Sequence, residues 1–330
     1  MQPKDTAPMK TMKTLKKYVY GSLGDTLFLW TIVALSITII ACTIVMAFTL
    51  YGDGAPAFRE FGFLGFLKSN IWDPGSRIQF GAAPFIVGTL VTSIVSLLIS
   101  FIPALSIAIF TTEYAPRWLQ SLIDNFVNLI AAIPSVIIGL WGIFVFVPWM
   151  RENVYMPVYM WSVESAPQLL AILGNPIGYG MTTATIILAL MILPYTTVLA
   201  AHAMMKVPKE QREAAYALGA TKWEVIRMAV IPYARAGILA GSMLSFGRAI
   251  GETMAVAMLI GNKNTLPFTI FGAGSTMPSV IVNEFREAVE NMHLSSLMAV
   301  GFQLFIISLA VNLLAAYIQN KFSVTGGQSA

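Results

Sequence analysis

The chain has 330 residues, of which 57% are hydrophobic and 11% are charged. Soluble proteins average about 45–50% and about 25%, so this composition leaves too little polar surface for soluble domains and predicts a membrane protein. A single cysteine, Cys42, excludes an internal disulfide, and with only two histidines in the chain we expect no metal site and no other cofactor. The formal net charge of +4 is too small to indicate binding of nucleic acid.

Six segments are long and apolar enough to cross a bilayer, which takes about 20 residues. The first, at residues 25–50, lies between a tail at 1–24 and an outside loop at 51–83, and a second tail at 321–330 ends the chain. The other five spans are expected at about residues 84–112, 123–150, 180–205, 236–262 and 295–320. Because these runs lack the alternation of membrane β-strands, the predicted fold class is all-α, a polytopic transmembrane bundle of six helices.

Prolines lie inside three of the expected spans. Pro103, Pro134 and Pro194 are predicted to kink their helices without ending them, because neighbouring helices can satisfy the carbonyls that a membrane proline frees. We therefore expect all three helices to continue past their prolines.

Lysine and arginine are distributed unequally between the two sides of these spans. Most of the 20 fall in segments that are cytoplasmic if the chain begins inside the cell. The positive-inside rule therefore predicts a multi-pass protein of the inner membrane with both termini in the cytoplasm. The basic first tail resembles that of a signal peptide, but the apolar run at 26–52 is too long for one and is interpreted as an uncleaved anchor.

The longest inside loop, residues 206–235, is expected to form two short helices joined by a tight turn. Gly219 supplies the left-handed residue that ends the first helix. Thr221 and Glu224 then have the spacing of a capping box at the start of the second helix. Pro232 is expected to end that second helix and return the chain to the membrane.

Five residues of this loop form a recognisable pattern: Glu213, Ala214, Ala215, then Gly219 after three residues and Pro232 after twelve more. The pattern resembles the EAA loop of ABC importer permeases. The resemblance implies a type I importer permease with a MetI-like core, and it implies that these five residues couple the chain to two copies of a separate cytoplasmic ATPase subunit. The alternative is a capped helix pair that only covers the cytoplasmic face, but this does not explain the small residues at positions where another surface could approach.

The stretch 247–262 reads Gly-Arg-Ala-Ile-Gly-Glu-Thr-Met-Ala-Val and then, after three residues, Ile-Gly-Asn. It is similar to the membrane subunits of the phosphate-specific importer, most of all to the C-type permease. This resemblance covers about residues 78–322 and implies a permease domain at 84–320. It also implies inorganic phosphate as the substrate, a heterodimer with an A-type permease subunit, and a periplasmic phosphate-binding protein as a further partner.

Arg248 and Glu252 interrupt the fifth span, where each opposes insertion by roughly 2.5–3.5 kcal/mol. A spacing of four places them on one helix face, where they can pair. A guanidinium matches phosphate oxygens with two parallel hydrogen bonds, so Arg248 is the candidate substrate-pathway ligand and Glu252 is expected to weaken its hold. Thr253 is a third candidate, as a hydrogen-bond donor. The alternative is a structural salt bridge that joins two helices.

The sequence therefore predicts the inner-membrane permease subunit of an ATP-driven, binding-protein-dependent phosphate importer. It contains no Gly-x-x-x-x-Gly-Lys-Ser/Thr motif, so we expect no catalytic residues and no ATPase site in this chain. Two alternatives remain open. The same class of permease could carry sulfate or molybdate, since one arginine does not choose among tetrahedral anions. An ion-coupled secondary transporter would need no ATPase, and the inside loop argues against it.

Overall fold

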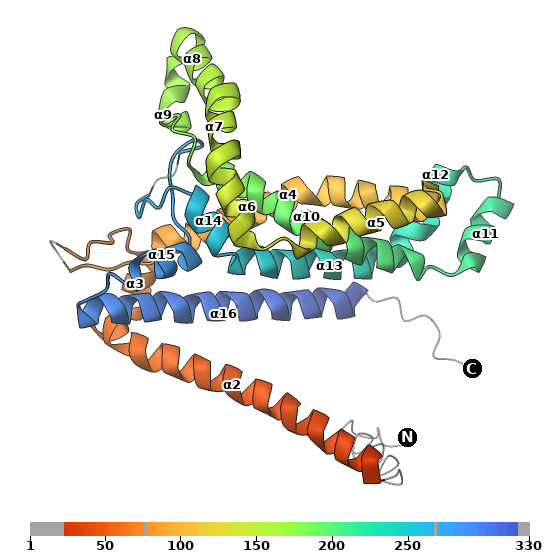
Figure 1. Cartoon of the computed structure of the whole chain (residues 1–330), viewed down its shortest axis with the longest axis horizontal. Coiled ribbons are helices and arrows are strands. Elements are labelled where there is room, and N and C mark those ends of the chain that lie inside the picture. The colour runs from red at the N-terminus through yellow and green to blue at the C-terminus, as the bar shows by residue number, and fades with distance from the viewer. Residues whose placement is uncertain (1–22, 76–77, 267–268, 323–330) are drawn as a thin grey trace, which may run out of the picture. The chain divides into compact units, whose positions relative to one another are not determined.

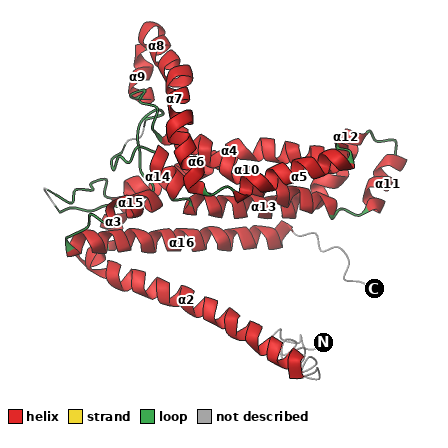
Figure 2. Cartoon of the chain, viewed as in Figure 1, coloured by secondary structure: helices red, strands yellow, loops and turns green. Residues whose placement is uncertain are grey.

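The computed structural model describes residues 23–75, 78–266 and 269–322, and within them it contains helices, turns and two isolated bridges but no β-strand (Figure 2). Six helical stretches are long and apolar enough to cross a membrane: Gly24–Phe61, Ala83–Tyr114, Ser135–Ser165, Met181–Met205, Lys222–Gly251 and Asn291–Gln319. The all-α fold class with six membrane-crossing helices is therefore confirmed. Nearly all of the two expected tails, 1–24 and 321–330, lies outside the described residues.

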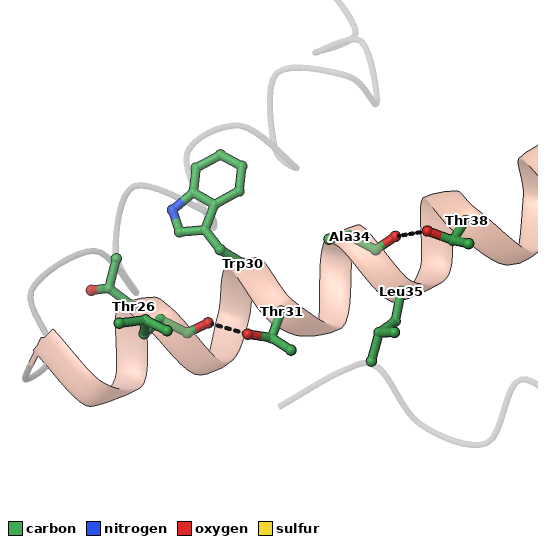
Figure 3. Close-up of a pocket in the computed structure, with 7 residues that line it drawn as sticks. Thr26, Trp30, Thr31, Ala34, Leu35 and Thr38 are labelled. Atoms are coloured by element: carbon green, nitrogen blue, oxygen red, sulfur yellow. Dashed lines mark hydrogen bonds between the residues drawn. The ribbon is translucent and has the colours of Figure 1, made fainter.

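The chain divides into two compact units, Met1–Gly52 and Asp53–Ala330. Helix α2 (Leu23–Phe61) supplies the described part of the first unit, and there nearly all of its large apolar side chains are exposed. Five of its hydroxyl groups donate to carbonyls of the same helix, among them those of Thr31 and Thr38 in Figure 3. Such internal bonds let a polar side chain face hydrocarbon, as a membrane-crossing helix requires.

Four helices lie side by side in the second unit: α4 (Ala83–Ile109), α10 (Met181–Met205), α13 (Ile231–Gly251) and α16 (Asn291–Phe322) (Figure 1). Glycine allows α10 and α13 to approach closely, because a Cβ atom on Gly241 would lie 2.6 Å from the Cβ of Leu199. Between the same helices, the hydroxyls of Thr196 and Ser245 are 2.8 Å apart and hydrogen-bonded. The core is therefore held by close packing and by buried hydroxyl groups, as is usual for helices within a membrane.

Two of the three prolines lie inside continuous helices, Pro103 in α4 and Pro194 in α10, as expected. Pro134 does not. Its neighbour Ile133 has an extended backbone, with φ −66° and ψ 125°, because a proline ring disfavours the helical conformation of the preceding residue. The prediction that Pro134 only kinks its helix is therefore wrong.

The third membrane-crossing stretch consequently differs from the helix expected at 123–150. Helix α5 (Arg117–Ala132) ends before the break, and a second helical stretch then runs to Ser165. This second stretch contains α6 (Ser135–Trp141), α7 (Val147–Met150) and α8 (Met156–Ser165). Figure 1 shows α6, α7 and α8 running away from the direction shared by α4, α10 and α13.

Four π-helical turns in the described chain each end two residues before a proline. The turns are Phe110–Tyr114, Gly142–Phe146, Arg151–Tyr155 and Ile226–Val230, and the prolines are Pro116, Pro148, Pro157 and Pro232. Proline lacks the N–H that would bond four residues back, and a π-helical turn widens the helix at that point. The helix thus continues through Pro232, from Lys222 to Gly251, and the prediction that Pro232 ends it is wrong.

Shorter helices lie at the two ends of the bundle (Figure 1). One end carries α3 (Phe63–Lys68), a 3₁₀ turn (Pro167–Leu169), α9 (Leu170–Leu173), α14 (Met254–Leu259) and α15 (Met277–Glu284). The other end carries α11 (Lys209–Ala217) and α12 (Lys222–Val225). The predicted inside loop is therefore the helical connection at the second end.

The carboxylate of Glu284, at the end of α15, joins several segments of the second unit. It accepts hydrogen bonds from Trp72 Nε1 and Asn264 Nδ2, each at 2.7 Å, and lies 2.9 Å from His293 Nε2. Trp72 and His293 are buried, and the His293 ring stacks on Phe80 with 5.4 Å between centroids. Glu284 thus ties the loops before α4 and after α14 to the first turn of α16.

Replacing Glu284 with alanine is expected to lower the free energy of unfolding by about 2–4 kcal/mol. The indole, amide and imidazole nitrogens would lose their shared acceptor, and each unsatisfied buried donor costs about 1–3 kcal/mol. Thermal unfolding of the purified protein in detergent measures the change. The exposed Glu287 provides the control, since Glu287→Ala is expected to leave the unfolding temperature unchanged; equal stability of the two variants would contradict the role given to Glu284.

Candidate functional site

The turn between α11 and α12 has the geometry that the sequence predicts. Gly219 has φ +83°, in the left-handed region that favours glycine, and its N–H donates to the Tyr216 carbonyl at 2.9 Å. The N–H of Thr221 donates to Glu224 Oε2 at 2.7 Å, which completes the capping box. The left-handed turn and the cap are therefore confirmed.

A groove of about 950 Å³ lies between α11 and the helical stretch that follows it. It brings together four of the residues predicted to couple to an ATPase: Ala214, Ala215, Gly219 and Pro232. Glu213 is exposed on the same helix α11. Leu218 and Met228, which also line the groove, are 89% and 61% exposed, and exposed apolar side chains grouped at a groove are typical of a surface that another protein covers.

Two consecutive residues directly after the C-terminal end of α4 hold both short helices. They belong to the π-helical turn Phe110–Tyr114, here called η1. Arg212 of α11 donates from Nη1 to Glu113 Oε2 at 2.9 Å and from Nη2 to the Met204 carbonyl at 2.9 Å. The ammonium of Lys222 lies 4.6 Å from the ring centroid of Tyr114. The groove is thus attached to the ends of α4 and α10.

Arg248 lies in the last turn of α13, and its side chain is exposed. Its guanidinium carbon lies 4.1 Å from the ring centroid of Tyr195, on α10. A cation over an aromatic ring contributes about 0.5–2 kcal/mol, depending on desolvation. Within the described residues Arg248 makes no ion pair and no hydrogen bond. Its N–H groups are therefore available to an anion.

The predicted pairing of Arg248 with Glu252 is not formed. Helix α13 ends at Gly251, and Glu252 has an extended backbone with φ −68° and ψ 124°, so it does not follow Arg248 by one helical turn. Its carboxylate accepts a hydrogen bond from the Ala255 N–H at 3.4 Å, at the start of α14. The salt bridge considered as the alternative role of this pair is therefore not present in the described chain.

The span expected at 236–262 is broken at the same place, because helical structure resumes only in α14 after Thr253. Glycine is a poor helix former, and Gly251 stands directly before the break. A Cβ atom on Gly251 would have no neighbour within 4 Å, so the break borders open space in this chain. The Thr253 hydroxyl donates to the Gly251 carbonyl at 3.1 Å and so satisfies one of the groups that the break frees.

Three residues of the site could not be found from the sequence: Glu113, Tyr195 and Arg212. Each makes its contact with another part of the chain, Arg212 with a carboxylate 99 residues away. Contacts of this range leave no signal in a single sequence.

The chain matches the sequence model of a family described as "Binding-protein-dependent transport system inner membrane component" over residues 104–324. It is 39% identical to the phosphate transport system permease protein PstC of Mesorhizobium japonicum over 307 residues, which cover 93% of each chain. It is also 37% identical to the protein of that name from Haemophilus influenzae, with 95% of this chain and 98% of the other covered.

Solved structures show the same fold at lower identity. A bacterial alginate ABC transporter, solved with its periplasmic protein, matches with a TM-score of 0.59 and 18% identity over 90% of this chain and 96% of that chain. The MetNI methionine ABC transporter matches with a TM-score of 0.53 and 17% identity over 76% and 99%. The expected MetI-like fold is thereby confirmed. The chain belongs to the family of binding-protein-dependent transport system inner membrane components, and within that family it groups with the permease proteins named PstC.

Proposed function

We propose that this chain is a permease subunit of an ATP-driven importer of inorganic phosphate and that Arg248, Glu252 and Thr253 lie on the substrate pathway. The observation that carries the proposal is the exposed guanidinium of Arg248, which has no carboxylate partner among the described residues and stands beside a helix break. Relatives similar over nearly the whole chain are named as phosphate transport permeases, which favours phosphate over other anions.

The chemistry of the break suits passage of an anion. A guanidinium binds two phosphate oxygens with parallel charge-assisted hydrogen bonds. The Glu252 carboxylate, four residues further along, opposes the negative charge of phosphate and so keeps binding weak enough for release. Thr253 is the neutral member of the three, and its hydroxyl can turn from the Gly251 carbonyl to a phosphate oxygen.

A second permease subunit is required, because one chain leaves this site open. Arg248 and Gly251 are exposed in the single chain, and nothing would contact a Cβ atom on Gly251. The proposal is that a related A-type subunit covers this side, so that each chain forms half of the pathway. A periplasmic phosphate-binding protein would deliver the substrate to the outer end.

Energy would reach the pathway through the groove between α11 and the helical stretch that follows it. Each of two cytoplasmic ATPase subunits would bind one such groove, with Glu213, Ala214, Ala215, Gly219 and Pro232 at the contact. When the ATPase displaces α11 and α12, the Arg212–Glu113 and Lys222–Tyr114 contacts would transmit that displacement to α4. The hydrogen bond from Arg212 to the Met204 carbonyl would transmit it to α10. Since the ATPase is cytoplasmic, this end of the bundle would face the cytoplasm, and both termini with it.

Uptake of radiolabelled phosphate into proteoliposomes tests the proposal. The vesicles would contain this chain with its A-type partner and ATPase, with ATP enclosed, the phosphate-binding protein outside and excess sulfate or molybdate as competitor. ATP-dependent uptake that neither anion reduces is the expected result. Competition would assign the permease to another oxyanion, and uptake driven by an ion gradient without ATP would reveal a secondary transporter.

Replacing Glu113 with glutamine is expected to lower the phosphate transported per ATP about three- to tenfold. The change leaves the partly buried Arg212 without its anion, so α11 is held less firmly to α4. Parallel measurement of uptake and ATP hydrolysis gives the ratio. The exposed Glu210, also on α11, provides the control Glu210→Gln. The exchanged pair, Glu113→Arg with Arg212→Glu, is expected to restore only part of the phosphate transported per ATP, because a glutamate cannot donate to the Met204 carbonyl. An unchanged amount of phosphate per ATP in Glu113→Gln would contradict the role of this contact.

A further inference from the structure

We infer that Tyr195 is a positioning residue for transport, which holds the guanidinium of Arg248 against its ring and leaves the N–H groups of that guanidinium free for the substrate anion. The inference rests on the proposed function, in which Arg248 binds phosphate. It assigns to an aromatic ring the pairing with Arg248 that the sequence suggested for the carboxylate of Glu252.

The contact between Arg248 and Tyr195 is close, and it is made by the guanidinium group over the face of the ring. The guanidinium carbon of Arg248 lies over the Tyr195 ring, 4.1 Å from its centroid. The quadrupole of an aromatic ring attracts a cation over its face, and the attraction grows where water is excluded. A ring offers no lone-pair acceptor in that direction, whereas a carboxylate would occupy the guanidinium fork with two hydrogen bonds. A ring therefore restrains the arginine without competing with phosphate for its donors.

Tyr195 is itself fixed at its far end. Its hydroxyl donates to the carbonyl of Ala131 at 3.1 Å. Helix α5 ends one residue after Ala131, so the Ser135 N–H, which would bond the Ala131 carbonyl in a continuous helix, lies beyond the break at Pro134. The tyrosine hydroxyl thus serves an acceptor that the break at Pro134 has freed.

The ring also starts from a fixed place on α10. It follows Pro194 directly, and Thr196 on its other side is buried and bonded to Ser245 of α13. The Ala131 carbonyl of α5 and the Arg248 guanidinium of α13 therefore both contact this one side chain of α10. Arg248 is held at a defined position even though its own helix ends three residues later.

Substitutions at Tyr195 separate the ring from the hydroxyl. In reconstituted complexes with the A-type subunit, the ATPase and the phosphate-binding protein, Tyr195→Leu and Tyr195→Met are expected to lower phosphate uptake about tenfold. Tyr195→Phe keeps the ring and is expected to retain at least about half of the uptake. The amount of assembled complex and its binding-protein-stimulated ATP hydrolysis are expected to stay at wild-type levels in all three variants.

A second tyrosine provides the matched control. Tyr317 on α16 lies 5.8 Å from the ammonium of Lys321, so it makes the same kind of contact with a different cation, near the end of that helix. Tyr317→Leu is expected to transport phosphate as the wild type does. Equal loss in this control would show that the effect is not particular to Arg248 and would overturn the inference.

Other outcomes are equally decisive. Wild-type uptake by Tyr195→Leu or Tyr195→Met would overturn the inference, since the ring would then be dispensable. Loss in Tyr195→Phe as large as in Tyr195→Leu would overturn it as well, because the hydroxyl bond to Ala131 would then carry the effect. Failure of the proposed function is seen separately, as a wild-type complex that takes up no phosphate or as Arg248→Gln that transports normally.

Discussion

Replacing Arg248 with glutamine is expected to reduce ATP-dependent phosphate uptake by about 100-fold or more. Two charge-assisted hydrogen bonds to the anion would be lost, each contributing about 1.5–3 kcal/mol, and a loss of roughly 3 kcal/mol already corresponds to more than 100-fold. Arg248→Lys keeps the charge but not the fork, so a loss of about tenfold is expected. Uptake into proteoliposomes under the conditions of the competition experiment measures both.

Assembly of the complex is expected to survive the same substitution. Arg248 is exposed in the chain and has no ion-pair partner among the described residues, so glutamine leaves no buried charge behind. The exposed Arg117, at the start of α5, provides the control Arg117→Gln, with uptake expected at the wild-type level. Normal transport by Arg248→Gln would remove Arg248 from the pathway, and loss of the assembled complex would give it a structural part instead.

The sequence was sufficient for features set by composition or by neighbouring residues. The spans around α4, α10 and α16 follow from continuous apolar runs, which have no other stable placement than a bilayer. The turn at Gly219 and the cap formed by Thr221 and Glu224 follow from local chemistry, since a left-handed backbone favours glycine and a free helix N-terminus favours a side-chain acceptor.

The effect of a proline or glycine inside an apolar run could not be predicted from the sequence in the same way. Pro134 ends a helix, whereas Pro103 and Pro194 lie within helices and Pro232 follows a π-helical turn. Which outcome occurs depends on whether other helices satisfy the freed carbonyls, and a single sequence does not contain that information.

The helix break after Gly251 changed the candidate site more than any other difference. A spacing of four predicts an ion pair only if the helix continues, and α13 ends between Arg248 and Glu252. The partner of Arg248 is Tyr195, on another helix, and it could be identified only once α10 and α13 were placed side by side. The residue proposed to bind the substrate was thus predictable from its charge within a membrane span, while its partner was not.

Replacing Gly219 with aspartate is expected to abolish transport-coupled ATP hydrolysis, to less than about 5% of wild type, while membrane insertion stays intact. A Cβ atom on Gly219 would have no neighbour within 4 Å, so the substitution causes no clash within the chain. It does place a side chain and a negative charge at the edge of the groove, where a partner surface would have to approach the backbone. The left-handed conformation adds about 1 kcal/mol of local strain, which is too little to unfold the protein.

Gly62 offers a control for that strain and for the charge. It has φ +69°, and a Cβ atom on it would also have no neighbour within 4 Å, but it precedes α3 at the end of the bundle away from α11 and α12. Gly62→Asp is therefore expected to leave the stimulation of ATP hydrolysis by the loaded phosphate-binding protein within about twofold of wild type. The backbone of Gly62, with φ +69° and ψ 142°, lies outside the regions that other residues favour, so Gly62→Asp carries backbone strain as well as the same new carboxylate. Coupled hydrolysis in Gly219→Asp equal to that in Gly62→Asp would remove the groove from the path by which ATP drives transport.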